Sequence, residues 1–371
     1  MRTVPLAGLP DVSVVCLGTM TWGSQNTEDE AHEQLDAFVA AGGNLIDTAE
    51  LYPVPPDPKY TGETELIIGR WLAKHPDLRS RVIIATKVAG PMPRNFVSAA
   101  REKALTGTLD PAAPLPRLVP EQIERGLAAS LARMQTDYVD LLQLHWPDRY
   151  TPLWGNNVYM KELEGKHEQQ PRSSEERVPF DDVVRCLGAL IEKGTIKAWG
   201  LSNETSYGVC EWVHAARRCG VPPPVTIQND FSLLDRRFES ELAETCSSVN
   251  HNVGLLAYGP LAGGTLSGKG YSEPGSRHVL FPNFQARYHC PASRDAAEKY
   301  AQLAHSKGLS PTTLALAWAY SRHFMTSVII GATKMKHLLE NIEAASIVLD
   351  KDTLHAIDAI HRAARNPNLR S

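Results

Sequence analysis

The sequence predicts a (β/α)8 barrel of the TIM-barrel class, with one domain spanning residues 1–371. Short apolar runs alternate with amphipathic segments about eight times along the chain, which is typical of parallel strands joined by helices. The length of 371 residues and the hydrophobic content of 43% allow one large core. Three of the runs end in the reactive side chains Asp47, Lys87 and His145. Active sites of such barrels lie at the C-terminal ends of the strands.

Residues 2–14 are expected to form a β-hairpin that closes the barrel floor, with its turn at 8–11. Thr27 is a candidate N-cap for the first helix, because apolar residues follow it at helical spacing. The strands are expected at 14–17, 45–47, 82–87, 138–144, 196–201, 225–228, 253–257 and 327–330. The helices are expected at 28–41, 63–74, 120–134, 181–193, 204–218, 238–247, 294–307 and 311–322.

Three connections are too long to be simple connectors, namely residues 88–118, 146–179 and 259–291. All three follow strands, so we expect them at the C-terminal mouth of the barrel as lids or binding loops. In the second loop, Trp146, Trp154 and Tyr159 are expected to line the substrate pocket. The charged run from Lys161 to Arg177 is interpreted as a solvated excursion.

Composition limits the possible partners and the cellular location. The net charge of -4, with both signs mixed, provides no basic face for nucleic acid. No apolar run is long enough to cross a bilayer, and Pro5, Gly8 and Pro10 interrupt any secretory signal near the N-terminus. The six cysteines are scattered without a CxxC pair, which favours reduced thiols. We therefore expect a cytoplasmic protein that binds neither nucleic acid nor membrane.

Four reactive residues are predicted to meet at the mouth. Asp47 and Tyr52 follow the apolar run of NLIDTAELY (44–52), Lys87 ends VIIATK (82–87), and His145 ends YVDLLQLH (138–145). Simpler interpretations exist: Asp47 as a helix N-cap, Lys87 as a solvated lysine, and His145 as a wall residue beside Trp146 and Pro147. Four such residue types at the ends of neighbouring strands favour an active site instead. We call Asp47, Tyr52, Lys87 and His145 the tetrad.

The chemistry of carbonyl reduction requires these residue types together. A free tyrosine has a pKa of about 10 and is a poor proton donor to a developing alkoxide at neutral pH. The ammonium group of Lys87 would lower the pKa of Tyr52, and the carboxylate of Asp47 would keep Lys87 charged and in place. A neutral His145 would orient the carbonyl group. Such a site would protonate a carbonyl oxygen while another group delivers hydride to the carbon.

Six sequence blocks resemble the aldo-keto reductase family at matching spacing over almost the whole chain. They are GTMTWG (18–23), LIDTAELY (45–52), TK (86–87), LLQLHWP (141–147), GLSNE (200–204) and IIGATK (329–334). The blocks MTWG, AELYPVPP and GLSNE look most like the Tas-like branch of that family. The resemblance implies NADPH-dependent reduction of aldehydes or ketones, with the tetrad as catalytic residues and Tyr52 as general acid.

The resemblance also implies a site for an extended NADPH across the mouth. It assigns the carboxamide contacts to Ser202, Asn203 and Gln228, and the ring that stacks on the nicotinamide to Tyr258, which is otherwise a core aromatic. Further implied cofactor contacts are Thr19, Met20, Asp47, Pro260, Leu261, Lys269, Arg277, Gly331, Ala332, Thr333, Lys334, His337, Glu340 and Asn341. The implied substrate contacts are Trp22 and Trp146, and no metal is expected.

Residues near 335 are expected to bind the adenosine phosphate of the cofactor. A helix N-terminus near residue 335 would bind a 2′-phosphate, and either Lys334 or Lys336 would add charge. His337 stands where the family has Gln or Arg, and Gly259 where it has Ser, so the preference for NADPH over NADH is a hypothesis. The GxGxxG motif is absent, and GGTLSGKG (263–270) ends in glycine where a P-loop needs Ser or Thr, which excludes a nucleoside triphosphatase.

Two other functions fit parts of the sequence. An NADPH-binding redox sensor or accessory subunit with little turnover would share the fold, but such relatives commonly lack the histidine that is retained here as His145. A Schiff-base aldolase using Lys87 is disfavoured because a lysine held charged by Asp47 is a poor nucleophile. A metal hydrolase is disfavoured because no HxH pair is present. We expect a small-molecule carbonyl substrate and a monomer or weak homo-oligomer.

Overall fold

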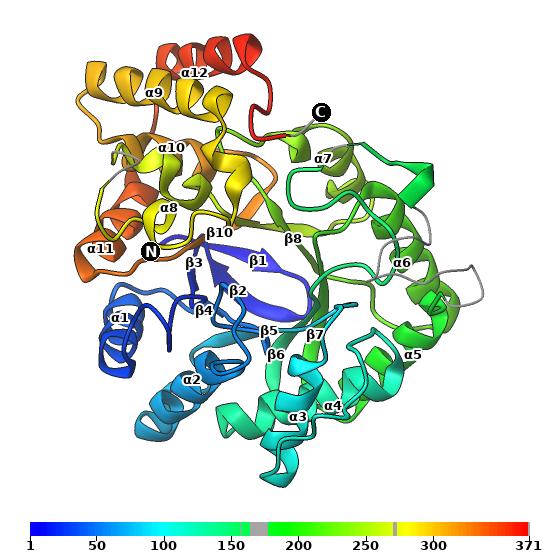
Figure 1. Cartoon of the computed structure of the whole chain (residues 1–371). Helices are drawn as coiled ribbons and strands as arrows, with labels where there is room; N and C mark the ends of the chain where they lie inside the picture. The colour runs from blue at the N-terminus through cyan, green and yellow to red at the C-terminus, as the bar shows by residue number, and fades with distance from the viewer. Residues whose placement is uncertain (157, 164–176, 270–272, 370–371) are drawn as a thin grey trace.

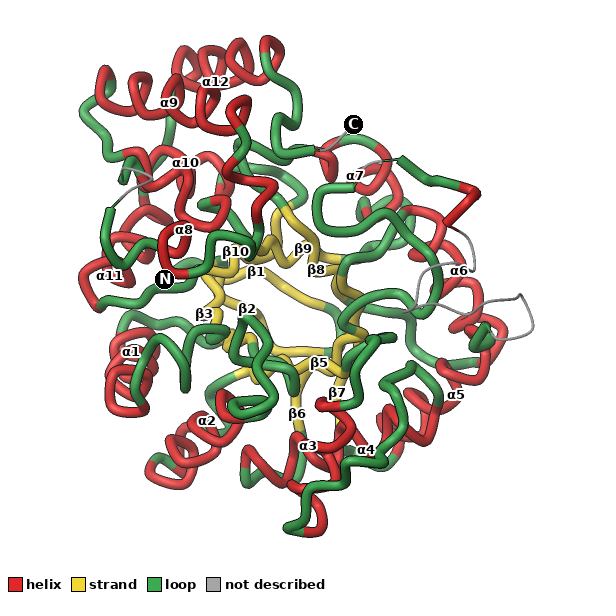
Figure 2. Tube along the Cα trace, viewed as in Figure 1, coloured by secondary structure: helices red, strands yellow, loops and turns green. Residues whose placement is uncertain are grey.

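The computed structural model describes residues 1–156, 158–163, 177–269 and 273–369. Within these residues, eight parallel strands close into a barrel in chain order, and helices surround it (Figures 1 and 2). The strands are β3 (Val15–Gly18), β4 (Leu45–Asp47), β5 (Ile83–Val88), β6 (Val139–Leu144), β7 (Ile196–Ser202), β8 (Thr226–Asp230), β9 (Gly254–Tyr258) and β10 (Met325–Ile330). The predicted (β/α)8 class is confirmed.

An antiparallel hairpin closes one end of the barrel. It consists of β1 (Thr3–Leu6) and β2 (Leu9–Ser13), and Figure 1 shows it across the ring of strands. Leu6 and Val12 of the hairpin pack with apolar residues of the barrel interior. The predicted floor is therefore confirmed, but its turn is tighter than expected. Leu6 pairs with Leu9, and Gly8 adopts the left-handed conformation (φ 72°) that such a turn requires.

The helices lie outside the barrel and bury its outer face in the larger apolar core. In the described chain they are α1 (Glu28–Ala40), α2 (Glu63–Lys74), α3 (Phe96–Thr106), α4 (Pro120–Met134), α5 (Phe180–Glu192), α6 (Ser206–Cys219), α7 (Glu241–Cys246), α8 (Arg277–Leu280), α9 (Pro291–Ser306), α10 (Pro311–Tyr320), α11 (Met335–Glu343) and α12 (Lys351–Ala363). The predicted N-cap of α1 is confirmed: Thr27 and Glu30 form a reciprocal capping box. None of these helices is long and apolar enough to span a membrane.

The long loops contain more regular structure than the sequence predicted. Helix α3 lies inside the connection 88–118, and the buried ion pair between its Arg101 and Glu50 (2.6 Å) holds it against the barrel. The expected helix 238–247 is broken at Ser240 into a 3-10 turn and α7, and α12 was not anticipated. Most of the charged run 161–177 lies outside the described residues, as does Gly270.

Candidate active site

A polar layer covers the apolar interior at the C-terminal end of the barrel. Alternate residues of a strand face the same side, so side chains two positions apart form successive layers. The apolar layer includes Leu45, Ala85 and Leu141. Two residues further along the same strands stand Asp47, Lys87 and Gln143. This alternation explains why a carboxylate and an ammonium group meet deep in the mouth of a hydrophobic barrel.

Lys87 is the centre of the tetrad. Its fully buried Nζ lies 2.6 Å from Oδ2 of Asp47, 2.9 Å from the carbonyl oxygen of Thr48 and 3.3 Å from the hydroxyl of Tyr52. The other carboxylate oxygen of Asp47 accepts hydrogen bonds from Nε2 of Gln228 at 2.8 Å and of Gln143 at 3.1 Å. The ammonium group is thus fixed between a carboxylate and a phenol, as the sequence predicted.

Burial and the neighbouring charges set the protonation states. Burial would lower the pKa of Lys87, but Asp47 and Tyr52 more than offset it, so the pKa is raised and the amine stays charged. Burial raises the pKa of the Tyr52 phenol, and the nearby Lys87 only partly opposes this effect. The sequence-based expectation was that Lys87 would lower the pKa of Tyr52. Lys87 does act in that direction, but the pKa is raised in total because burial has the larger effect. Tyr52 is therefore a protonated phenol at neutral pH and retains the proton that a general acid must donate.

His145 completes the tetrad from the next strand end. Its ring lies edge-on to that of Tyr52, with the ring centroids 5.9 Å apart. Burial, followed by the charge of Lys87, moves the pKa of His145 well below its usual value, so the imidazole is neutral. Its Nδ1 is buried without a hydrogen-bond partner in the described structure. An unsatisfied imidazole beside a phenol is available to orient a polar group that enters the site.

A cavity of about 740 Å³ opens above the polar layer. Most of the residues singled out by the sequence line it: Thr19, Met20, Asp47, Tyr52, His145, Trp146, Ser202, Asn203, Gln228, Tyr258, Pro260, Leu261, Lys269, Arg277, Gly331, Ala332, Thr333, His337, Glu340 and Asn341. Lys87 lies behind the wall and acts on the cavity through Asp47 and Tyr52. A volume of this size is within the usual range for cofactor and ligand sites.

The middle of the cavity presents polar groups held in fixed positions. The hydroxyl of Tyr258 donates to Oδ1 of Asn203 at 2.7 Å, and Nδ2 of Asn203 donates to the carbonyl oxygen of His145 at 2.9 Å. Asn203 has a left-handed backbone (φ 54°), which asparagine tolerates better than most residues. The amide of Asn203 therefore links the ring of Tyr258 to the strand end that carries His145.

One end of the cavity is cationic and suits phosphate groups. Lys269, Arg277 and Lys336 line it. Lys336 lies in the first turn of α11, whose N-terminus has no side-chain cap, and Lys269 hydrogen-bonds His337 of the same helix at 2.8 Å. Arg277 hydrogen-bonds Gln285 at 3.2 Å but forms no ion pair in the described chain, and burial lowers its pKa to about 10. The half-buried guanidinium of Arg277, with no carboxylate beside it in the described chain, is available to bind an anion. The residues of this end thus fit a dinucleotide with phosphate groups.

Three predicted residues lie elsewhere. Trp22 was expected to contact substrate, but it is fully buried in the apolar core with Leu35 and Phe38 and does not line the cavity. Lys334 is exposed at the N-cap of α11, and Lys336 lines the cavity instead. Tyr159 packs on Tyr150 (5.0 Å between ring centroids), while Trp146 and Trp154 do line the cavity. Residues one or two positions apart at a strand end or in a helix point in different directions, which accounts for Trp22 next to the lining residue Thr21 and for Lys334 next to Lys336.

Several residues of the site were not predicted. Gln143 donates a hydrogen bond to Asp47. A polar residue inside the apolar run LLQL was the sequence signal that could have identified it as part of the site. The anchoring of Glu50 by Arg101 and the buried pair of Asp230 with Arg287 join segments distant in the sequence. No local pattern reports such contacts.

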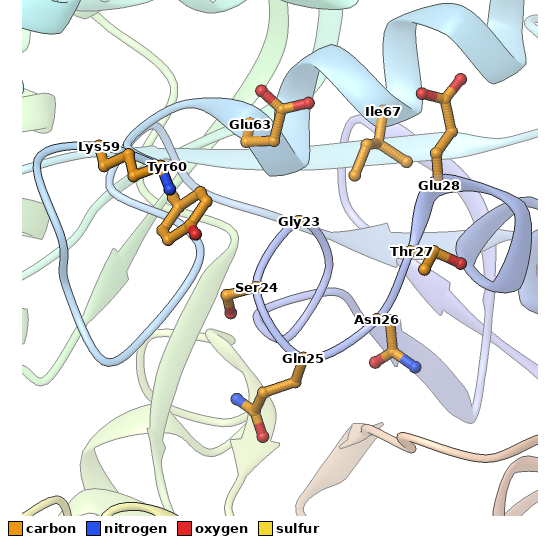
Figure 3. Close-up of a pocket in the computed structure, with 10 residues that line it drawn as sticks. All are labelled: Gly23, Ser24, Gln25, Asn26, Thr27, Glu28, Lys59, Tyr60, Glu63 and Ile67. Atoms are coloured by element: carbon orange, nitrogen blue, oxygen red, sulfur yellow. The ribbon is translucent and has the colours of Figure 1, made fainter.

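A second pocket, of about 540 Å³, opens on the surface beside the first (Figure 3). It lies between the loop after β3 and the N-terminal part of α2, and Gln25 lines both pockets. The sticks of Figure 3 show the ten residues that line it, namely Gly23, Ser24, Gln25, Asn26, Thr27, Glu28, Lys59, Tyr60, Glu63 and Ile67. These ten include no member of the tetrad and no predicted cofactor contact, so the cavity above the tetrad is the candidate active site.

The chain is similar to known proteins over most of its length. The Aldo/keto reductase family model matches residues 14–362. "Protein tas" of Escherichia coli (strain K12) is 41% identical over 363 residues, 96% of either chain. An "Aldo-keto reductase" of Babesia bovis is 35% identical over 296 residues, 78% of this chain and 98% of the relative. The "Uncharacterized oxidoreductase YrpG" of Bacillus subtilis is 29% identical over 352 residues, 94% and 92% of the two chains.

Proposed function

This chain belongs to the aldo/keto reductase family of oxidoreductases, and we propose that it reduces aldehydes or ketones to alcohols with NADPH. One observation carries the proposal: Nζ of Lys87 lies between the carboxylate of Asp47 and the phenol of Tyr52, and both of these side chains line the cavity. Bound NADPH would supply the hydride. The tetrad supplies the proton and positions the carbonyl group.

Tyr52 is the proposed general acid. Its phenol lines the cavity and is protonated at neutral pH, because burial raises its pKa. As negative charge develops on the carbonyl oxygen, the phenol donates its proton, and the ammonium of Lys87 stabilises the phenolate that forms. Asp47 keeps Lys87 charged and in place, and the neutral imidazole of His145 orients the carbonyl oxygen.

The cavity supports the cofactor assignment. Asn203 and Tyr258 hydrogen-bond each other beside the strand end that carries His145. Asn203 would hold the carboxamide of a nicotinamide, and the ring of Tyr258 would stack on it. The cationic end with Arg277 and Lys336 would hold the phosphate groups of the extended dinucleotide. The 2′-phosphate of NADPH would lie at the N-terminus of α11, which explains the preference for NADPH that we propose.

The test follows NADPH absorbance while the purified protein meets a panel of aldehydes, dicarbonyls and quinones, with NADH in parallel. Loss of the NADPH band with a preferred carbonyl, faster than with NADH, is the expected result. Tight NADPH binding by fluorescence without turnover of any carbonyl would contradict the reductase and favour a cofactor-sensing protein.

A further inference from the structure

Arg287 is a buried cation in the wall of the cavity that the proposed reduction does not use. It lies in the 3-10 turn Ala286–His289, on the connection between β9 and α9, and only 5% of it is exposed. Its guanidinium pairs with Asp230 at the end of β8, where Nη2 and Nε lie 2.9 and 3.2 Å from Oδ2. Nη2 also donates to the hydroxyl of Tyr288 at 3.0 Å.

These contacts leave part of the guanidinium free. The donors on Nε and Nη2 are used, but the two N–H groups of Nη1 have no hydrogen-bond partner among the described residues. Since Arg287 lines the cavity, a ligand there can reach it. Asp230 lies on the side of the guanidinium that carries Nε and Nη2, so an anion at Nη1 would be closer to the positive charge than to the carboxylate.

The surroundings place Arg287 on the substrate side of the cavity. A Cβ on Gly155 would lie 2.9 Å from Cδ of Arg287, so the loop after β6 rests directly on the arginine stem. The adjacent Trp154 contacts Trp146 at 5.9 Å between ring centroids, and Trp146 contacts His145 at 4.7 Å. These contacts form a continuous aromatic wall from Arg287 to the tetrad.

A second contact connects the same turn to the proton donor. Phe284, three residues before Arg287, lines the cavity and packs against the small apolar cluster that contains Tyr52 and Val54. An apolar body bound between Phe284 and the tryptophans would therefore extend from the reacting carbonyl toward the guanidinium. Two of the cations proposed to hold phosphate groups lie at α11 instead, since Lys336 belongs to that helix and Lys269 hydrogen-bonds its His337 at 2.8 Å.

We propose that Arg287 binds a carboxylate on the substrate, so that the enzyme prefers carbonyl compounds with an apolar body and a carboxylate at its far end. This assignment rests on the proposed reductase function and defines its substrate class. Arginine suits the role because it is always charged and directs several N–H donors at a carboxylate. Asp230 acts as a positioning residue that fixes the guanidinium while weakening its field.

The experiment compares two substrates that differ only in charge, 4-carboxybenzaldehyde and methyl 4-formylbenzoate. The measured quantity is the ratio of their kcat/KM values with NADPH in the full-length protein. A charge-assisted hydrogen bond predicts a wild-type ratio of about 10 to 100 in favour of the carboxylate. Turnover of the ester alone would support the reductase and overturn the role of Arg287, so the two proposals fail separately.

Variants test whether Arg287 is the source of the preference. Arg287→Met is expected to bring the ratio close to one, whereas Arg287→Lys keeps a positive charge and retains part of the preference. Asp230→Asn keeps an acceptor for the guanidinium but removes the opposing charge, so the ratio is expected to rise. The matched control is Arg237→Met, because Arg237 pairs with Asp235 at 2.8 Å and does not line the cavity.

Three results would overturn the assignment. A wild-type ratio near one would exclude carboxylate recognition, whether or not any variant folds. An unchanged ratio in both Arg287→Met and Asp230→Asn would make the buried pair purely structural. A weaker NADPH affinity in Arg287→Met with an unchanged substrate ratio would assign the arginine to the cofactor instead.

Discussion

Replacing Tyr52 with phenylalanine removes one oxygen atom and tests the proposed general acid directly. The lost hydroxyl lies 3.3 Å from Nζ of Lys87, which keeps its shorter contacts to Asp47 (2.6 Å) and the carbonyl of Thr48 (2.9 Å). The ammonium therefore stays paired and the ring keeps its apolar contacts, so the fold should survive. General acid catalysis contributes about 10²- to 10⁴-fold, which corresponds to about 2.7 to 5.4 kcal/mol of barrier.

The assay is single-turnover oxidation of bound NADPH by the preferred carbonyl, with the NADPH dissociation constant measured by fluorescence titration. We expect the rate constant to fall by the factor above and the dissociation constant to change little. Tyr60→Phe, at the neighbouring surface pocket, is the matched control. A near-normal rate in Tyr52→Phe would refute the reasoning and make His145 the next candidate donor.

Three further perturbations follow from the geometry. Lys87→Met leaves the carboxylate of Asp47 buried without a cation beside it. The free energy of unfolding, measured in urea, should therefore fall by about 3–5 kcal/mol. The control Lys299→Met, on the exposed face of α9, should leave this free energy unchanged. The pKa of His145 is held well below its usual value, so the folded protein binds this proton less readily than the unfolded chain. Stability should therefore decline as pH falls below about 6.5, and His145→Gln should decline less over the same window; parallel curves for the two proteins would contradict the depressed pKa. Lys336→Gln should weaken NADPH binding about 5- to 10-fold more than NADH binding. The control Lys334→Gln should affect both cofactors little, because Lys334 does not line the cavity. Equal weakening of NADPH and NADH binding by Lys336→Gln would argue against a contact with the 2′-phosphate.

The tetrad was predictable because its signals are local. An apolar run that stops at a charged or phenolic residue marks a strand end, and strand ends of a parallel barrel converge at one mouth. Ser202, Gln228 and Tyr258 were implied by the family resemblance, and all three line the cavity. The regular alternation of strands and helices predicted the barrel, and the turn residues within 8–11 predicted the hairpin of its floor.

Prediction was weakest where contacts join distant segments. Trp22 belongs to a sequence block beside the site, yet its side chain turns into the core. Helix α3 was not predicted within its long loop, because the ion pair that holds it, between Arg101 and Glu50, joins residues 51 positions apart in the sequence. Neither the direction of a side chain nor the partner of a buried charge is encoded in a local pattern.

The sequence by itself thus predicted the barrel and the convergence of the tetrad at its mouth, because period-2 and helical spacing place residue types at known positions along each element. The family resemblance implied the cofactor. Only the tertiary structure decided which lysine of the pair 334 and 336 lines the cavity, and that burial outweighs Lys87 in setting the pKa of Tyr52. The tertiary structure alone also showed that Arg287 lies in the cavity wall beside Trp154. These outcomes depend on distances and solvent exclusion in three dimensions, since the field at an ionisable group is set by all the elements packed around it.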